Sequence, residues 1–141
     1  MSRDADITFT FTREVKVQEF MRVVLDAGWI PDDHGVIRYL VDPDMCDWST
    51  AELDNLAFVV AELERRRVSG SSCAVMLTWG DTAIGGMFMF TADGSLMLTP
   101  VINAVTRQGF DNLVDFEWYL QRLLGALAEV GFAGYVITDM P

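Results

Sequence analysis

The chain has 141 residues, 51% of them hydrophobic, and 21 acidic residues against 10 basic ones give it a formal net charge of −11. This length and apolar fraction suit a single domain, residues 1–141, with one substantial core. The negative charge argues against binding to nucleic acid or to an anionic membrane, because both require a cationic surface. Met1–Asp6 lacks the apolar stretch of a signal peptide, and no apolar run could span a bilayer, so we expect a cytoplasmic protein.

The N-terminal part of the chain predicts a strand, a helix and a second strand. Ile7–Thr12 alternates strictly between apolar side chains and threonines, which is typical of a half-buried strand. Apolar residues recur at helical spacing over Val17–Leu25, and Gly28 is placed to end that helix in the left-handed conformation. The next strand is expected at Val36–Val41.

A second helix is expected to follow the loop at residues 42–49. Ser49 fits the N-cap and Glu52 the third helical position, and the two together form a capping box. Apolar residues at helical spacing over Leu53–Leu63 supply the buried stripe, and the helix is expected to end near Arg67.

Three antiparallel strands are predicted between Cys73 and Asn103, joined by turns at Gly80-Asp81 and Asp93-Gly94. Asp-Gly between apolar runs favours a two-residue turn, which pairs Phe90 with Met97. Side-chain alternation then places a set of bulky residues beneath the helices. This set consists of Cys73, Val75, Leu77, Trp79, Ile84, Phe88, Phe90, Met97 and Val101.

The opposite face of these three strands is rich in methionine. It collects Ala74, Met76, Thr78, Met87, Met89, Thr91, Leu96 and Leu98. Methionine is adaptable, and an exposed apolar sheet surface usually has an occupant. We therefore expect this face to be either a surface for self-association, through Met87, Met89 and Leu98 of a homodimer, or a surface that binds a partner.

A third helix is expected over Leu113–Val130 and a short last strand at Tyr135–Thr138. The elements together predict a two-layer α+β domain. In this fold, a mainly antiparallel six-stranded sheet carries three helices that pack largely on one face.

Motifs that would carry catalysis are missing from the sequence. It has no nucleophile elbow, phosphate-binding loop or dinucleotide-binding fingerprint. His34, the only histidine, lies in a polar turn without a nucleophile to serve. Asp42, Asp44 and Asp47 could ligate a hard cation, but the glycine and glutamate of an EF-hand loop are missing. We expect no enzymatic activity, no cofactor and no metal.

The best candidate for a binding site is the acidic segment Asp42–Asp54. It contains no base, and it holds Met45 and Trp48 among its acids. Acidic groups around apolar anchors suit a basic protein surface, whereas the alternative is a solvated loop whose acids favour the dipole of the next helix. The residues predicted to bind a partner are Asp42, Asp44, Asp47, Trp48, Glu52 and Asp54.

The segment Ala74–Asn103 contains Met-Phe-Met-Phe, Asp-Gly and Leu-Met-Leu-Thr-Pro-Val-Ile-Asn. In layout it resembles the central hairpin of some contact-dependent inhibition immunity proteins. The acidic charge and the small α+β layout also resemble bacterial toxin-immunity proteins, which implies a cytoplasmic protein that neutralises a basic toxin. Type III secretion chaperones, which are small acidic dimers, are the second family that the chain resembles. A small enzyme or ligand-binding domain of unknown substrate is the remaining alternative.

Overall fold

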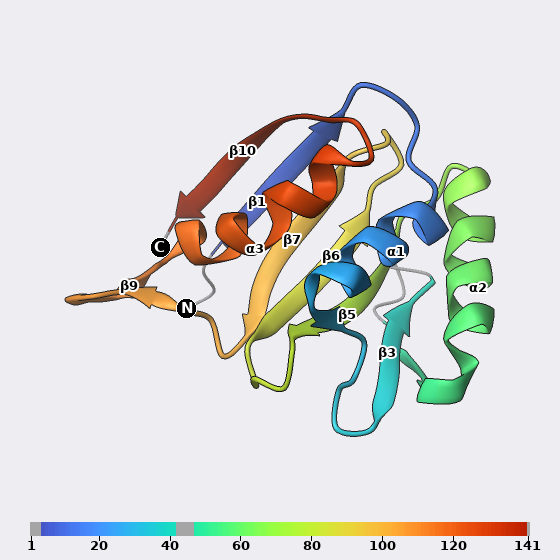
Figure 1. The fold of residues 1–141 in the computed structure, drawn as a ribbon, viewed down its shortest axis with the longest axis horizontal. Coiled ribbons are helices and arrows are strands. Elements are labelled where there is room, and N and C mark those ends of the chain that lie inside the picture. Colours follow the sequence, from blue (N-terminus) through green and yellow to red (C-terminus); the bar gives the residue numbers. More distant parts are fainter. Residues whose placement is uncertain (1–3, 42–46, 141) are drawn as a thin grey trace.

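The computed structural model describes residues 4–41 and 47–140, which form an eight-stranded antiparallel sheet, three helices and a two-stranded sheet (Figure 1). In chain order the elements are β1 (Asp4–Phe11), α1 (Val17–Ala27), β2 (Trp29–Ile30), β3 (Val36–Leu40), β4 (Ser49–Glu52), the 3-10 turn η2 (Leu53–Asn55), α2 (Leu56–Val68), β5 (Cys73–Trp79), β6 (Gly85–Phe90), β7 (Leu96–Ile102), β8 (Thr106–Arg107), β9 (Phe110–Val114), α3 (Phe116–Ala128) and β10 (Phe132–Met140). The main sheet has the order β10-β1-β7-β6-β5-β3-β4, and β2 pairs with β5.

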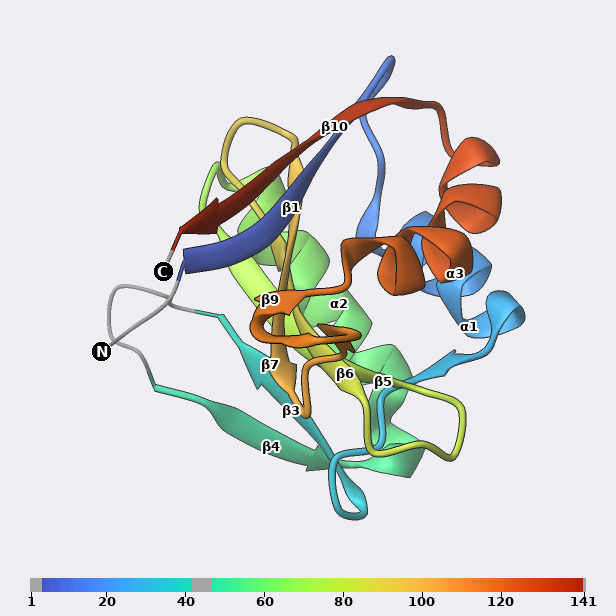
Figure 2. The same cartoon turned by 90° about the vertical axis from the view of Figure 1, so that its left-hand side faces the viewer.

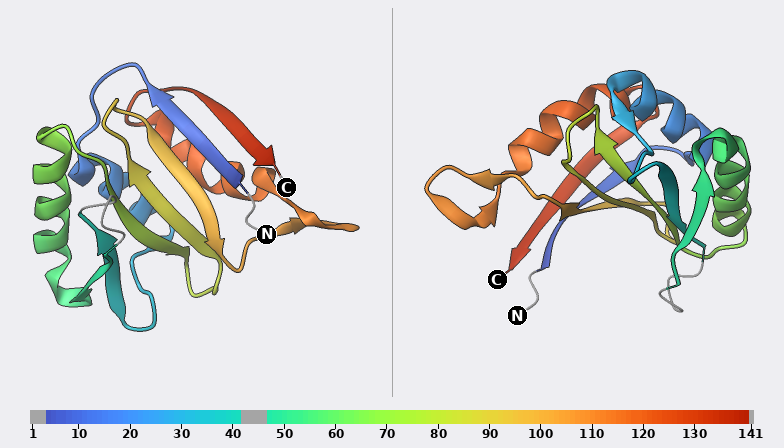
Figure 3. Two further views of the ribbon diagram at one scale, coloured as in Figure 1. Left: turned by 180° about the vertical axis from the view of Figure 1, so that it is seen from behind. Right: turned by 90° about the horizontal axis from the view of Figure 1, so that it is seen from below.

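All three helices lie on one face of the main sheet, and we call the other face the helix-free face (Figure 3). Helix α1 lies between α2 and α3 and contacts both. Phe20 of α1 packs on Phe88 and Phe90 of β6, with ring centroids 5.7 and 5.1 Å apart. The α+β class, the three helices and the burial of Phe88 and Phe90 beneath them are therefore confirmed.

Local sequence explains the first two elements. Ile7 and Phe9 of β1 are fully buried, as the alternation with threonine predicts. Helix α1 ends at Gly28, whose φ of 125° suits glycine, and its N–H donates to the carbonyls of Val24 and Leu25 at 3.2 Å. Trp29 is then fully buried, with its ring centroid 5.3 Å from that of Phe88.

The loop between β6 and β7 is one residue longer than predicted. The N–H of Thr91 donates to the carbonyl of Ser95 at 3.0 Å, so residues 92–94 form the loop. Gly94 lies at its end with φ of 90°, in the left-handed conformation that a three-residue hairpin loop requires. The predicted two-residue turn is therefore wrong.

This extra residue reverses the faces of β7, because a shift of one position moves every side chain of a strand to the other face. Phe90 pairs with Leu96 instead of Met97. Leu96 and Leu98 are buried beneath the helices, whereas Val101, which lies at an irregularity in the pairing of β6 with β7, is 55% exposed. The loop between β5 and β6 also differs in length from the prediction, but by an even number of residues. An even shift leaves every side chain on the same face, so the faces of those two strands are as expected.

Ser49–Glu52 forms β4 instead of the first turn of a helix. It pairs with β3, with Ser49 opposite Tyr39 and Glu52 opposite Val36 (Figure 2). Helix α2 begins only at Leu56, and its N-cap residue forms no side-chain cap. A ladder of backbone hydrogen bonds outweighs one capping box, which is worth about 1 kcal/mol. Together with β2, this strand raises the main sheet from six predicted strands to eight.

The C-terminal part also differs in its boundaries. Leu113 and Val114 belong to β9, so α3 begins at Phe116, after the N-cap residue Asp115. The last strand, β10, covers nine residues instead of the four predicted. Its pairing with β1 runs along the whole of that strand.

Candidate binding surface

The structure places part of the predicted acidic site on one continuous stretch. Two of the six predicted residues, Asp42 and Asp44, lie outside the described residues. The other four are Asp47, Trp48, Glu52 and Asp54. Asp47 and Trp48 lie just before β4, Glu52 is the last residue of β4, and Asp54 lies in η2. Trp48 is half-buried, and the three acids are exposed. Among the described residues, the three acids form no ion pair with any side chain.

Exposed apolar side chains share this stretch of chain with the acids, and Leu53 lies between Glu52 and Asp54. Leu53 is 41% exposed and Phe58 is 58% exposed. Ala57 and Ala61 are also exposed on α2. The predicted buried stripe included Leu53, which is wrong because α2 begins at Leu56 and Leu53 lies in the preceding turn. Phe58 was not predicted as a binding residue because it lies outside the apolar stripe predicted over Leu53–Leu63.

A groove of about 420 Å³ runs between α1 and α2 beside this surface. Its apolar lining includes Met21 and Leu25 of α1 and Val60 of α2. Ala57 and Ala61 line the groove too, and their short side chains leave space between the two helices. We call Leu53, Ala57, Phe58 and Ala61, with Asp47, Glu52 and Asp54, the α2 surface.

Two of the three arginines at the other end of α2, Arg65 and Arg67, are paired with neighbouring acids. The guanidinium of Arg67 lies 2.7 Å from Glu64 and 2.9 Å from Glu14, and that of Arg65 lies 3.0 Å from Glu62. The hydrogen bond from Arg67 is the main reason why the pKa of Glu64 is lowered. Asp47, Glu52 and Asp54 are therefore not paired with Arg65 or Arg67, although these basic residues follow closely in the sequence, and the basic residue Arg22 lines the neighbouring groove.

The methionine face contains two of the three residues predicted for self-association. Met87 and Met89 are half-buried on the helix-free face, and Met89 lies opposite Met97 of β7. Leu98 is fully buried beneath the helices, because β7 is reversed. Placing Leu98 on this surface was therefore wrong, and self-association through Met87 and Met89 stays a prediction.

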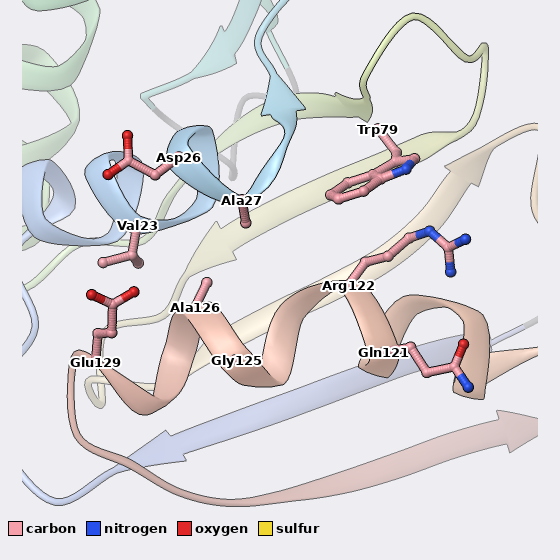
Figure 4. Close-up of a pocket in the computed structure, with 9 residues that line it drawn as sticks. All are labelled: Val23, Asp26, Ala27, Trp79, Gln121, Arg122, Gly125, Ala126 and Glu129. Carbon is pink, nitrogen blue, oxygen red and sulfur yellow. The ribbon is translucent and has the colours of Figure 1, made fainter.

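A second hollow, of about 590 Å³, lies between α1 and α3 (Figure 4). Arg122 lines one end, where its guanidinium lies 4.0 Å from the ring centroid of Trp118 and 5.6 Å from that of Trp79. Asp26 and Glu129 lie at the other end. The lining residues include no nucleophile with an adjacent base, so this hollow offers separated charges without a catalytic pair.

The histidine and the described cysteine have local explanations. The His34 side chain is 95% exposed in its turn. Cys73 is fully buried, its thiol donates to the carbonyl of Leu63, and burial raises its pKa to about 12. Such a thiol is unreactive. Over residues 4–41 and 47–140, no three metal-ligating side chains gather in a cluster and no helix is long and apolar enough to cross a membrane.

Comparisons of the chain with protein-family models, with curated proteins and with solved structures found no match. The functional argument therefore rests on the surfaces of the molecule.

Proposed function

We propose that the protein is a non-enzymatic, cytoplasmic binding protein that captures a basic polypeptide, in the manner of an immunity protein that neutralises a toxin. The α2 surface would make the contact. The observation that carries this proposal is that Asp47, Glu52 and Asp54 are exposed and form no ion pair among the described residues, and that the same stretch of chain exposes the side chains of Leu53 and Phe58.

The two kinds of side chain would serve different steps of binding. The net charge of −11 attracts a cationic partner and raises the association rate. Phe58 supplies an aromatic anchor of the kind that dominates binding energy, and the groove between α1 and α2 can accept apolar side chains of the partner. Asp47, Glu52 and Asp54 would then pair with basic residues around these anchors.

The first experiment is to find the partner, by co-purification and by testing the polypeptide encoded beside this protein for toxicity and basic charge. With that polypeptide in hand, replacing the three acids (Asp47→Asn, Glu52→Gln, Asp54→Asn) should slow association about tenfold at low salt. Phe58→Ala should instead speed dissociation, by about 30-fold if Phe58 is a central anchor. Surface plasmon resonance separates the two rates.

Matched controls lie away from the α2 surface. Asp81→Asn and Asp111→Asn remove exposed acids elsewhere, and Val68→Ala truncates a side chain that is 69% exposed at the far end of α2. These controls should leave both rates within about twofold of the wild type, since surface positions outside an interface contribute little. An acidic partner, or binding that is indifferent to the triple variant and to Phe58→Ala, would refute the proposal.

A further inference from the structure

The outer edge of β10 is long and unpaired. This strand has nine residues and stands at the end of the main sheet, with β1 on its inner side. No other segment of residues 4–41 and 47–140 lies beyond it (Figures 1 and 3). Among the described residues, the outward row of backbone N–H and C=O groups therefore has no strand partner.

The two edges of the sheet differ in the features that discourage pairing. Natural edge strands are usually short, or are protected by lysine, proline or other charged residues. The strand at the opposite edge, β4, has only four residues and ends in the exposed Glu52. In contrast, β10 has no lysine, arginine or proline, and Tyr135, Val136 and Ile137 are 45%, 65% and 40% exposed. Such an edge is suited to being paired.

We propose that β10 pairs antiparallel with β10 of a second copy of the chain, so that two main sheets join across a two-fold axis at Val136. In this register Val136 faces its own copy, and Tyr135 of each chain lies opposite Ile137 of the other. Aromatic and β-branched pairs of this kind stabilise antiparallel strands. Each pair joins two odd-numbered or two even-numbered residues, whose side chains point to the same face of their strands. The helix-covered faces of both sheets therefore lie on the same side.

The sequence of β10 is self-complementary in this register. Phe132 lies opposite Met140 of the other copy, Ala133 opposite Asp139, and Gly134 opposite Thr138. The one charged residue of the strand, Asp139, is therefore kept away from its own copy. The two aspartates lie about 20 Å apart, at about 3.4 Å per residue. That distance exceeds the screening length of about 8 Å at physiological salt, so their repulsion is weak.

The order of residues along β10 favours a second copy as the occupant, because its central pairs are aromatic and β-branched and its one charged residue does not meet itself. This dimer does not depend on the basic partner proposed above.

Sedimentation equilibrium of the full chain tests the dimer. The wild type should have about twice the chain mass of 15.8 kDa, and Val136→Lys should reduce it to 15.8 kDa, because two like charges would face each other at the axis. Val101→Lys is the control: Val101 is 55% exposed but lies on the inner strand β7, so this variant should stay dimeric.

Cysteine cross-linking tests the register independently of stability. In a Cys46→Ser background, Val136→Cys should form a disulfide-linked dimer on oxidation, since directly opposed Cβ atoms lie about 4.5–5.5 Å apart. Thr138→Cys lies on the same face but about 14 Å from its own copy, so it should not cross-link. Cys73 is fully buried and should not interfere.

Three outcomes would overturn the proposal. One is a wild type that sediments as a monomer throughout a concentration series. Another is equal cross-linking of the cysteine variants at positions 136 and 138, which would indicate random collision. The third is a dimer that resists Val136→Lys but dissociates on combined Met87→Glu and Met89→Glu substitution, which would move the interface to the methionine face.

Discussion

The carboxylate of Glu64 in α2 forms hydrogen bonds that link α2 to the start of α1. Its Oε1 accepts a hydrogen bond from the N–H of Val17 at 3.2 Å, and both carboxylate oxygens accept from Arg67, at 2.7 and 2.9 Å. The N-cap residue of α1, Lys16, provides no side-chain cap. A residue of α2 therefore satisfies a backbone donor that would otherwise lack a partner at the start of α1.

Replacing this carboxylate should destabilise the fold. Glu64→Gln weakens the hydrogen bonds to a guanidinium whose side chain is only 12% exposed, so we expect a loss of about 2 kcal/mol in the free energy of unfolding. The control Glu62→Gln removes a pair with Arg65, whose side chain is 64% exposed, and should cost less than about 0.5 kcal/mol. Urea unfolding measures both. Equal losses would show that Glu64 has no special role.

The same residue predicts a pH dependence. The hydrogen bond from Arg67 is the largest cause that lowers the pKa of Glu64 below its ordinary value of 4.5. A carboxyl whose pKa is lower in the folded state stabilises the fold above its unfolded pKa, and this contribution is lost as pH falls through the folded pKa. The difference in stability between the wild type and Glu64→Gln should therefore be largest near neutral pH and shrink below about pH 4. A constant difference from pH 7 to pH 3 would contradict this.

At the scale of elements, two glycines in different settings should respond oppositely to alanine. A Cβ at Gly86 in β6 would overlap with the carbonyl oxygen of Thr99, a backbone atom that cannot move easily. Gly86→Ala should therefore destabilise the fold by about 3 kcal/mol. Gly125 in α3 has no atom within 4 Å of such a Cβ, so Gly125→Ala should stabilise the helix by about 0.5–1 kcal/mol. Thermal unfolding distinguishes the two, and destabilisation by Gly125→Ala would contradict the assigned packing.

The elements with strong periodicity could be predicted from the sequence, whereas those that depend on distant partners could not. The inward faces of β1, β5 and β6 follow from alternation alone. Ser49–Glu52 carries a local helix-start signal, but β3 recruits it as a strand, which only the folded sheet reveals. One additional loop residue at Gly94 reversed β7 and removed Leu98 from the predicted surface.

The candidate binding site was also predicted only in part, because part of it depends on tertiary packing. Exposed acids such as Asp54 follow from charge, because carboxylates without partners stay in water. The exposure of Leu53 and Phe58 depends on where α2 begins and on how it is rotated against α1. That rotation is set by tertiary packing and is not encoded in the local pattern.

At the scale of the whole molecule, negative charges are in excess, and some of the positive charges are matched locally. Arg13, Arg38, Arg65 and Arg67 each form an ion pair. Acids such as Asp47, Glu52 and Asp54 have no such partner among the described residues. The folded chain therefore experiences a net self-repulsion, which opposes compaction.

Salt should therefore stabilise this protein. The screening length falls from about 30 Å at 0.01 M salt to about 8 Å at 0.15 M, which weakens repulsion across the whole surface, whereas the exposed ion pairs that salt also weakens are worth little. We expect the free energy of unfolding to rise by about 1 kcal/mol over this range of sodium chloride.

The triple variant Asp47→Asn, Glu52→Gln, Asp54→Asn removes three negative charges, so it should gain less from salt and match wild-type stability at 0.15 M within about 0.5 kcal/mol. Urea unfolding at both salt concentrations measures this, and a wild type that salt destabilises would show that ion pairs outweigh self-repulsion. Because the triple variant should be as stable as the wild type, any slower capture of a basic partner by it would reflect lost attraction and not misfolding.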